Sequence, residues 1–130
     1  MQLYLLIALG GAIGSVLRFF IDGLVVSQLG ASFPWGTLLI NVTGSFLIGL
    51  IFHVTEPAGR WFATPEVRQF LMTGICGGYT TFSAFSLRTL TLARSGEWFY
   101  AGAYVIASLV LCLVAVWLGY ALAASLNQPR

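Results

Sequence analysis

Four long apolar stretches follow one another along the chain of 130 residues, at about residues 2–26, 35–53, 67–93 and 98–124. A helix needs about 20 apolar residues to cross the hydrocarbon core of a bilayer, and each stretch is long enough to do so. Only 8% of the residues are charged, against roughly 25% in a soluble domain. No charged segment precedes the first stretch, so we expect it to be retained rather than cleaved as a signal peptide. The sequence therefore predicts an all-α membrane protein, with residues 1–130 forming one domain of four transmembrane helices.

The third stretch contains an unusual segment, Gly74–Ser86. Two adjacent glycines, Gly77 and Gly78, are followed there by a run of hydroxyl and aromatic side chains, and each glycine weakens a helix by about 1 kcal/mol. We therefore expect this helix to break in the middle of the membrane, around Gly77 to Thr81. Freed backbone groups survive at that depth only inside protein or beside a wet cavity, and transporters use them as ion ligands. On local physics alone, a glycine hinge with ordinary aromatic packing is equally consistent with the segment.

The first two stretches carry isolated polar side chains. In the first, Gly10 and Gly14 allow close helix approach, and Arg18 and Asp22 follow at a spacing of four. The sequence modestly favours a mutually paired anchor at the membrane interface for Arg18 and Asp22, and a buried arginine facing an aqueous vestibule is the alternative. In the second stretch, Asn41 is either glue between helices or part of a polar pathway, and the sequence favours neither.

The fourth stretch has a polar stripe. Tyr104, Ser108 and Cys112 recur every four residues, which places them on one face of a helix. Such a stripe on an otherwise apolar helix faces either partner helices or a pathway.

Arginines in the connecting segments normally decide which side of a membrane protein stays in the cytoplasm. Four spans place three arginines on each side: Arg60, Arg68 and Arg130 on the side of the N-terminus, and Arg18, Arg88 and Arg94 on the other. This balance favours neither insertion over the other. We therefore expect both orientations and an antiparallel homodimer, since four helices are also few to enclose a pore.

The chain offers no constellation typical of catalysis. It has only four acidic residues, and its one histidine, His53, has no nucleophile partner in the sequence pattern. The two cysteines, Cys76 and Cys112, lack the spacing of a metal site. The sequence predicts a protein that is not an enzyme, and the net charge of +2 gives no reason to expect a nucleic-acid partner.

Ion handling fits these residues better. Phe82 and Phe85 share a helix face, and the positive edges of two aromatic rings could hold a small anion without a fixed charge. Conduction requires such weak, multi-site binding. The backbone carbonyls of Gly77 and Thr80 would suit a small structural cation. Amide and hydroxyl donors that could replace the water around an anion are Asn41, Thr81, Ser83, Tyr104 and Ser108.

The same residues carry a resemblance to a known family. The segments Gly10–Gly14 with Arg18, Trp35–Leu38 with Asn41, and above all Gly77–Ser86 resemble the Fluc/CrcB fluoride channels. The match covers all four stretches, and the run Gly-Gly-x-Thr-Thr-Phe-Ser-x-Phe-Ser is its most specific part. The resemblance implies a channel in the bacterial inner membrane that exports fluoride passively and so lowers its toxicity. It also implies an antiparallel, dual-topology homodimer in the lipid bilayer, with two pores.

The resemblance further implies roles for individual residues. A structural Na⁺ ion at the dimer interface would be held by the backbone carbonyls of Gly77 and Thr80, contributed by both subunits. The other implied roles are pore phenylalanines for Phe82 and Phe85, a pore amide for Asn41, a polar track for Tyr104 and Ser108, and a vestibule for Arg18. The chain departs from the family pattern at Cys112 and Val116, where hydroxyls usually continue the track, and at Arg88, where members often carry glutamate.

Two other functions compete with a fluoride channel. A small multidrug-type proton-coupled cation exporter would share the four helices, but it needs a carboxylate near the middle of the first helix. The only acid in that stretch is Asp22, which lies near its end. A membrane subunit without transport activity, whose polar residues only hold helices together, is the third interpretation.

Overall fold

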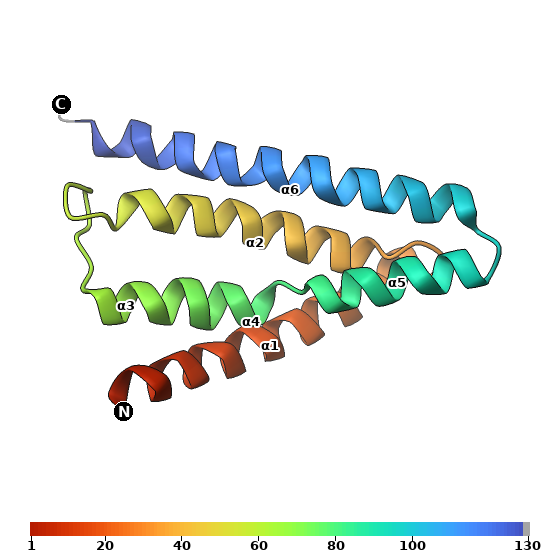
Figure 1. Cartoon of the computed structure of the whole chain (residues 1–130), viewed down its shortest axis with the longest axis horizontal. Helices are drawn as coiled ribbons and strands as arrows, with labels where there is room; N and C mark the ends of the chain where they lie inside the picture. Colours follow the sequence, from red (N-terminus) through yellow and green to blue (C-terminus); the bar gives the residue numbers. More distant parts are fainter. Residues whose placement is uncertain (129–130) are drawn as a thin grey trace.

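The computed structural model describes residues 1–128, and over this range the chain is helical apart from short connections (Figure 1). The helices are α1 (Gln2–Leu29), α2 (Trp35–Val54), α3 (Pro65–Gln69), η1 (Phe70–Cys76), α4 (Gly77–Tyr79), α5 (Phe82–Arg94) and α6 (Trp98–Asn127). The expected all-α fold is confirmed, and α1, α2, the rod from α3 to α5, and α6 make four helical segments. The N-terminus and the end of α6 lie at the same end of the bundle, which fits four antiparallel helical segments (Figure 1). Arg130, which entered the charge balance, lies outside the described residues.

Much of the apolar surface faces outward, as in a protein that lipid surrounds. Within the described residues, α1, α2 and α6 are each long and apolar enough to cross a membrane. Large side chains such as Phe19 and Trp117 are 84% and 71% exposed. The rod from α3 to α5 covers residues 65–94, but its helical pieces are individually shorter.

Glycines bring the helix backbones into direct contact. A Cβ atom on Gly10 of α1 would lie 2.8 Å from the carbonyl oxygen of Phe70, and one on Gly78 would lie 2.5 Å from that of Gly11. Between α2 and α6, a Cβ on Gly49 or Gly119 would collide with backbone in the same way. Small residues allow this close approach, which replaces the hydrophobic effect as the force that associates helices in lipid.

Helical geometry stops at Thr80 and Thr81, midway along the bundle (Figure 1). Their backbone angles are extended, with φ −81° and ψ 158° at Thr80 and φ −154° and ψ 114° at Thr81. Gly77 keeps helical angles, φ −65° and ψ −37°, so the interruption occupies only the last part of the expected range, Gly77 to Thr81. The absent side chain of Gly78 serves its contact with α1 instead. The preceding η1 is a π-helix, a form that often occurs near functional sites.

Candidate functional site

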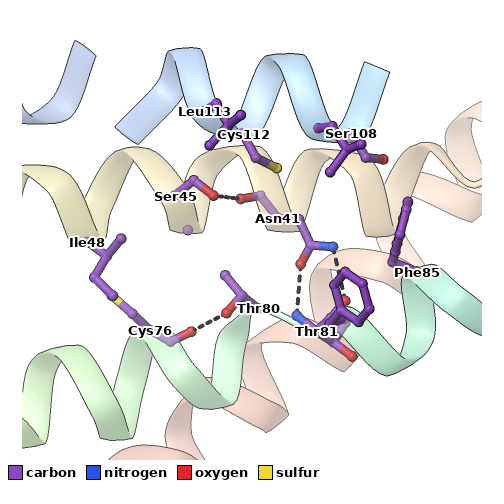
Figure 2. A pocket seen from close by; sticks show the side chains of 13 residues that line it. Asn41, Ser45, Ile48, Cys76, Thr80, Thr81, Phe85, Ser108, Cys112 and Leu113 are labelled. Carbon is purple, nitrogen blue, oxygen red and sulfur yellow. Dashed lines mark hydrogen bonds between the residues drawn. The ribbon is translucent and has the colours of Figure 1, made fainter. Parts of the chain in front are cut away.

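An open groove of about 340 Å³ lies beside the interruption (Figure 2). Helices α2 and α6 form one wall, and the end of η1, the extended pair Thr80–Thr81 and the start of α5 form the other. None of the described lining residues has a charged side chain, so the groove presents amide, hydroxyl, thiol and aromatic groups on an apolar wall. The lining residues are Asn41, Gly44, Ser45, Ile48, Cys76, Thr80, Thr81, Phe82, Phe85, Ser108, Leu109, Cys112 and Leu113.

The side chain of Asn41 is bound to the interruption by two hydrogen bonds (Figure 2). The backbone N–H of Thr81 donates to Oδ1 of Asn41 at 2.8 Å, and Nδ2 of Asn41 donates to the carbonyl of Thr81 at 3.1 Å. In a continuous α-helix the Thr81 N–H would donate to the carbonyl of Gly77. Asn41 thus replaces a helical hydrogen bond and holds the chain extended. Asn41 therefore links α2 to the interruption by hydrogen bonds, as the first of its two predicted roles requires. Its side chain also lines the groove.

The interruption leaves the last carbonyls of α4 without helical donors. The carbonyl of Gly78 accepts hydrogen bonds from α1 instead, at 3.3 Å from Nε of Arg18 and 3.4 Å from Oγ of Ser15. On the other side of the interruption, the hydroxyl of Thr81 caps α5 by accepting from the N–H of Ala84 at 3.1 Å. Asn41 of α2 therefore holds the extended Thr81 directly, and side chains of α1 bind the end of α4 just before the interruption.

Aromatic rings form a row from the surface into the core. Phe82, at the start of α5, is 75% exposed, and its ring centroid lies 5.2 Å from that of Phe85. The Phe85 ring lies 5.3 Å from that of Tyr104, which is completely buried and meets Phe33 edge-on at 5.7 Å. One end of the row is therefore open on the surface of the single chain, beside the groove.

Two buried hydroxyls of α6 lack hydrogen bonds. Within the described residues, the Tyr104 hydroxyl and the Ser108 Oγ have no partner, although Thr37 of α2 lies near Tyr104. An unpaired buried polar group costs about 1–3 kcal/mol, so native structures rarely leave one without a purpose. Ser108 lines the groove, and Tyr104 lies one helical turn before it on the same face of α6.

The groove brings together six of the predicted site residues: Asn41, Thr80, Thr81, Phe82, Phe85 and Ser108. The other four lie around it. Tyr104 is in the core behind Phe85, and Arg18 contacts the interruption from α1. Ser83 is exposed, with its Oγ 3.2 Å from that of Thr81, and Gly77 is exposed on α4.

The predicted pairing of Arg18 with Asp22 is wrong. Among the described residues, the carboxylate of Asp22 pairs with Arg88 of α5 at 3.5 Å, and Arg18 turns to the carbonyl of Gly78. A pair four residues apart on a helix is stabilised by only about 0.2–0.5 kcal/mol, so partners on neighbouring helices readily replace it.

Two further features of the site were not predicted. Ser45 lines the groove and donates to the backbone carbonyl of Asn41 at 2.7 Å. Its spacing of four from Asn41 is a signal that could have found it. The hydroxyls of Thr43 and Tyr79 lie 2.9 Å apart and link α2 to α4, a contact between distant segments that no local pattern indicates.

Comparison with known proteins establishes the family. Residues 5–120 match the family described as CrcB-like protein, Camphor Resistance (CrcB). The chain belongs to the CrcB family. A relative from Opitutus terrae, named fluoride-specific ion channel FluC, is 58% identical over 130 residues, which cover 100% of this chain and 98% of the relative.

Other CrcB relatives are almost as similar. Proteins with the same name from Rhodospirillum rubrum and Methylocella silvestris are 53% and 51% identical, over 96% and 98% of this chain and 97% of each relative. Together with three helices able to span a membrane within residues 1–128, these matches make this CrcB member a multi-pass inner-membrane protein.

Proposed function

We propose that this chain forms a fluoride-selective channel that lets cytoplasmic fluoride leave the cell passively and so lowers its toxicity. The observation that carries the proposal is the uncharged groove at the interruption, where the exposed ring of Phe82 lies beside Phe85 and neutral donors. The same chain is similar over its whole length to proteins named fluoride-specific ion channels. Neutral donors and aromatic edges around an open groove suit ion transport.

The groove supports weak anion binding at several places. The positive edges of Phe82 and Phe85 attract an anion without a fixed charge, and hydroxyls replace part of its water. Ser108 and Tyr104 are well suited to this role because their buried oxygens lack partners within the described chain. Thr81 and Ser83 present hydroxyls at the exposed end of the row. The amide of Asn41 has one donor committed to Thr81, which leaves its second N–H for an anion.

The groove is open in one chain, and we propose that a second copy in antiparallel orientation closes it. A Phe82 ring that is 75% exposed next to polar backbone is better covered by protein than by lipid. Within the described residues the other arginines remain balanced, with Arg60 and Arg68 towards one end and Arg88 and Arg94 towards the other, while Arg18 lies at the interruption. The interruption would then lie at mid-membrane in both subunits.

A structural Na⁺ ion fits the backbone of the interruption. The carbonyl of Gly77 has lost its helical donor to Asn41, and Thr80 is extended, so two hard oxygen ligands lie close in sequence. Two carbonyls from one chain are too few for a cation, and a two-fold dimer would double them. When bound, the ion would balance the carbonyl dipoles of the two interruptions. The guanidinium of Arg18, held by Gly78, would add positive charge in an adjoining vestibule.

A proton-coupled cation exporter finds no support here. The carboxylate of Asp22, the only acid of α1, is paired with Arg88 rather than free for proton exchange.

The test is fluoride efflux from liposomes that contain the purified chain, read with a fluoride electrode, with chloride efflux measured in parallel. We expect rapid fluoride release with chloride retained. Phe82→Ile should abolish the release while the dimer still assembles, because an aliphatic side chain has no positive edge. Phe99→Ile is the matched control, since Phe99 of α6 is 81% exposed and does not line the groove. Equal fluoride release by wild type and Phe82→Ile would remove the aromatic site from the mechanism.

A further inference from the structure

An ion pair between α1 and α5 lies about one helical turn of α5 beyond Phe85. The guanidinium of Arg88 lies 3.5 Å from the carboxylate of Asp22, and their side chains are 47% and 28% exposed. Arg88 follows Phe85 by three residues, so the two share a face of α5. The Phe85 ring in turn lies against that of Tyr104, with ring centroids 5.3 Å apart. The pair is therefore close to the row that the anion would follow.

Asp22 has a second support that does not involve Arg88. A Cβ atom on Gly36, in the first turn of α2, would collide with the carboxylate of Asp22, so this carboxylate packs directly against the start of α2. The unpaired backbone N–H groups of a helix start favour a negative charge beside it. Asp22 is thus fixed in place, and Arg88 reaches it from the more exposed side.

The pair has a direct consequence for an anion. An unpaired arginine at this place would raise the local concentration of anions, and an unpaired aspartate would lower it. The groove itself carries no charge on its described lining residues, so the nearest fixed charges have a large share in the local potential.

We propose that Asp22 balances the charge of Arg88 and thereby sets how readily anions reach the aromatic row. This inference rests on the proposed fluoride channel and adds to it a pair of residues that controls access rather than selectivity. Asp22 limits anion accumulation and Arg88 promotes it, so the native pair adds no net charge to that of Arg18.

The test uses Asp22→Asn, Arg88→Gln and the double variant in the full-length chain, reconstituted in liposomes. Charge near an entrance is screened over about 30 Å at 0.01 M salt and about 3 Å at 1 M. Fluoride efflux is therefore measured at both extremes of ionic strength. Asp22→Asn should raise the initial rate of fluoride efflux about two- to tenfold at low ionic strength, which is the range for one unpaired charge at an intermediate dielectric. At high ionic strength the rate should be nearly unchanged, because salt screens the charge.

The other variants separate access from structure. Arg88→Gln should slow efflux at low ionic strength only, and the double variant should return close to wild type. For Asp22→Asn, the half-saturating fluoride concentration should fall while the maximal rate and the exclusion of chloride stay the same. Glu97→Gln is the matched control, because it removes one exposed negative charge between α5 and α6 without touching the pair.

The outcomes that overturn the inference are distinct from failure of the channel itself. Fluoride flux that is present but equal in wild type and Asp22→Asn at low ionic strength refutes it. So does a change that persists at high salt, or one that Glu97→Gln reproduces. Absence of any fluoride flux in wild type refutes the proposed function, and this inference with it.

Discussion

The interruption in the rod from α3 to α5 depends on one side chain of another helix, because Asn41 of α2 makes two hydrogen bonds to Thr81. Asn41→Leu removes both bonds, at 2.8 Å and 3.1 Å, and leaves the N–H and the carbonyl of Thr81 without these partners. Each unpaired backbone group costs about 1–3 kcal/mol in a protein interior, whereas hydrogen bonds between membrane helices average about 0.6 kcal/mol. Because Thr81 is only partly buried, we expect the free energy of unfolding to fall by about 1–4 kcal/mol.

Denaturant unfolding of the detergent-solubilised protein measures this loss. Ser45→Ala is the control, because it removes one bond on the same helix, to a carbonyl that already belongs to the α2 ladder, and should cost about 0.5 kcal/mol or less. Fluoride efflux should also fall about tenfold or more in Asn41→Leu, since Phe82 follows directly after the residue that Asn41 holds. If Asn41→Leu is no less stable than Ser45→Ala, the two bonds do not hold the interruption and the reasoning fails.

Two further predictions follow from the backbone contacts and from the cation site. Gly14→Ala should destabilise the protein by about 1–3 kcal/mol, because the new Cβ would lie 2.7 Å from the backbone nitrogen of Tyr79. The atoms nearest to it belong to the backbone and cannot move aside as a flexible side chain would. Gly23→Ala, on the same helix with open space around it, should be neutral or slightly stabilising in the same unfolding assay, and equal losses in both would refute the packing argument. Replacing Na⁺ by a larger cation during purification and assay should slow fluoride efflux. Indifference to the cation would argue against a site at Gly77 and Thr80.

The long apolar helices α1, α2 and α6 were predictable because they depend on composition, whereas the exact position of the interruption within Gly77 to Thr81 was not. Glycine propensity is a local quantity, and it placed the break only within about Gly77 to Thr81. In the structure, Gly78 packs on the backbone of α1, and Gly77 keeps helical angles. The chain leaves the helix only where Asn41, 40 residues earlier, takes the N–H of Thr81. A partner that distant in sequence is invisible to reasoning from propensity.

The partners of the charged side chains were missed for a related reason. Spacing along one helix paired Arg18 with Asp22, but a freed carbonyl inside a membrane protein needs a donor more than an interfacial carboxylate needs a cation. Nε of Arg18 therefore donates to the carbonyl of Gly78, and the carboxylate of Asp22 pairs with Arg88 instead. The candidate site residues themselves were found because phenylalanines, hydroxyls and an amide are rare together in apolar helices. Their roles in conduction stay predictions.

The interruption also explains why the polar groups of this apolar chain gather where they do. Ser15, Arg18 and Asn41 come from two different helices, and each donates to the carbonyl of Gly78 or of Thr81. A helix that is interrupted within a membrane needs such donors for its freed carbonyls, so polar side chains are required near the interruption. An anion pathway can then use the remaining N–H and O–H groups at little additional cost, because the desolvated polar site already exists. On this view, the arginine and asparagine first stabilise the backbone, and their use in transport depends on that structural role.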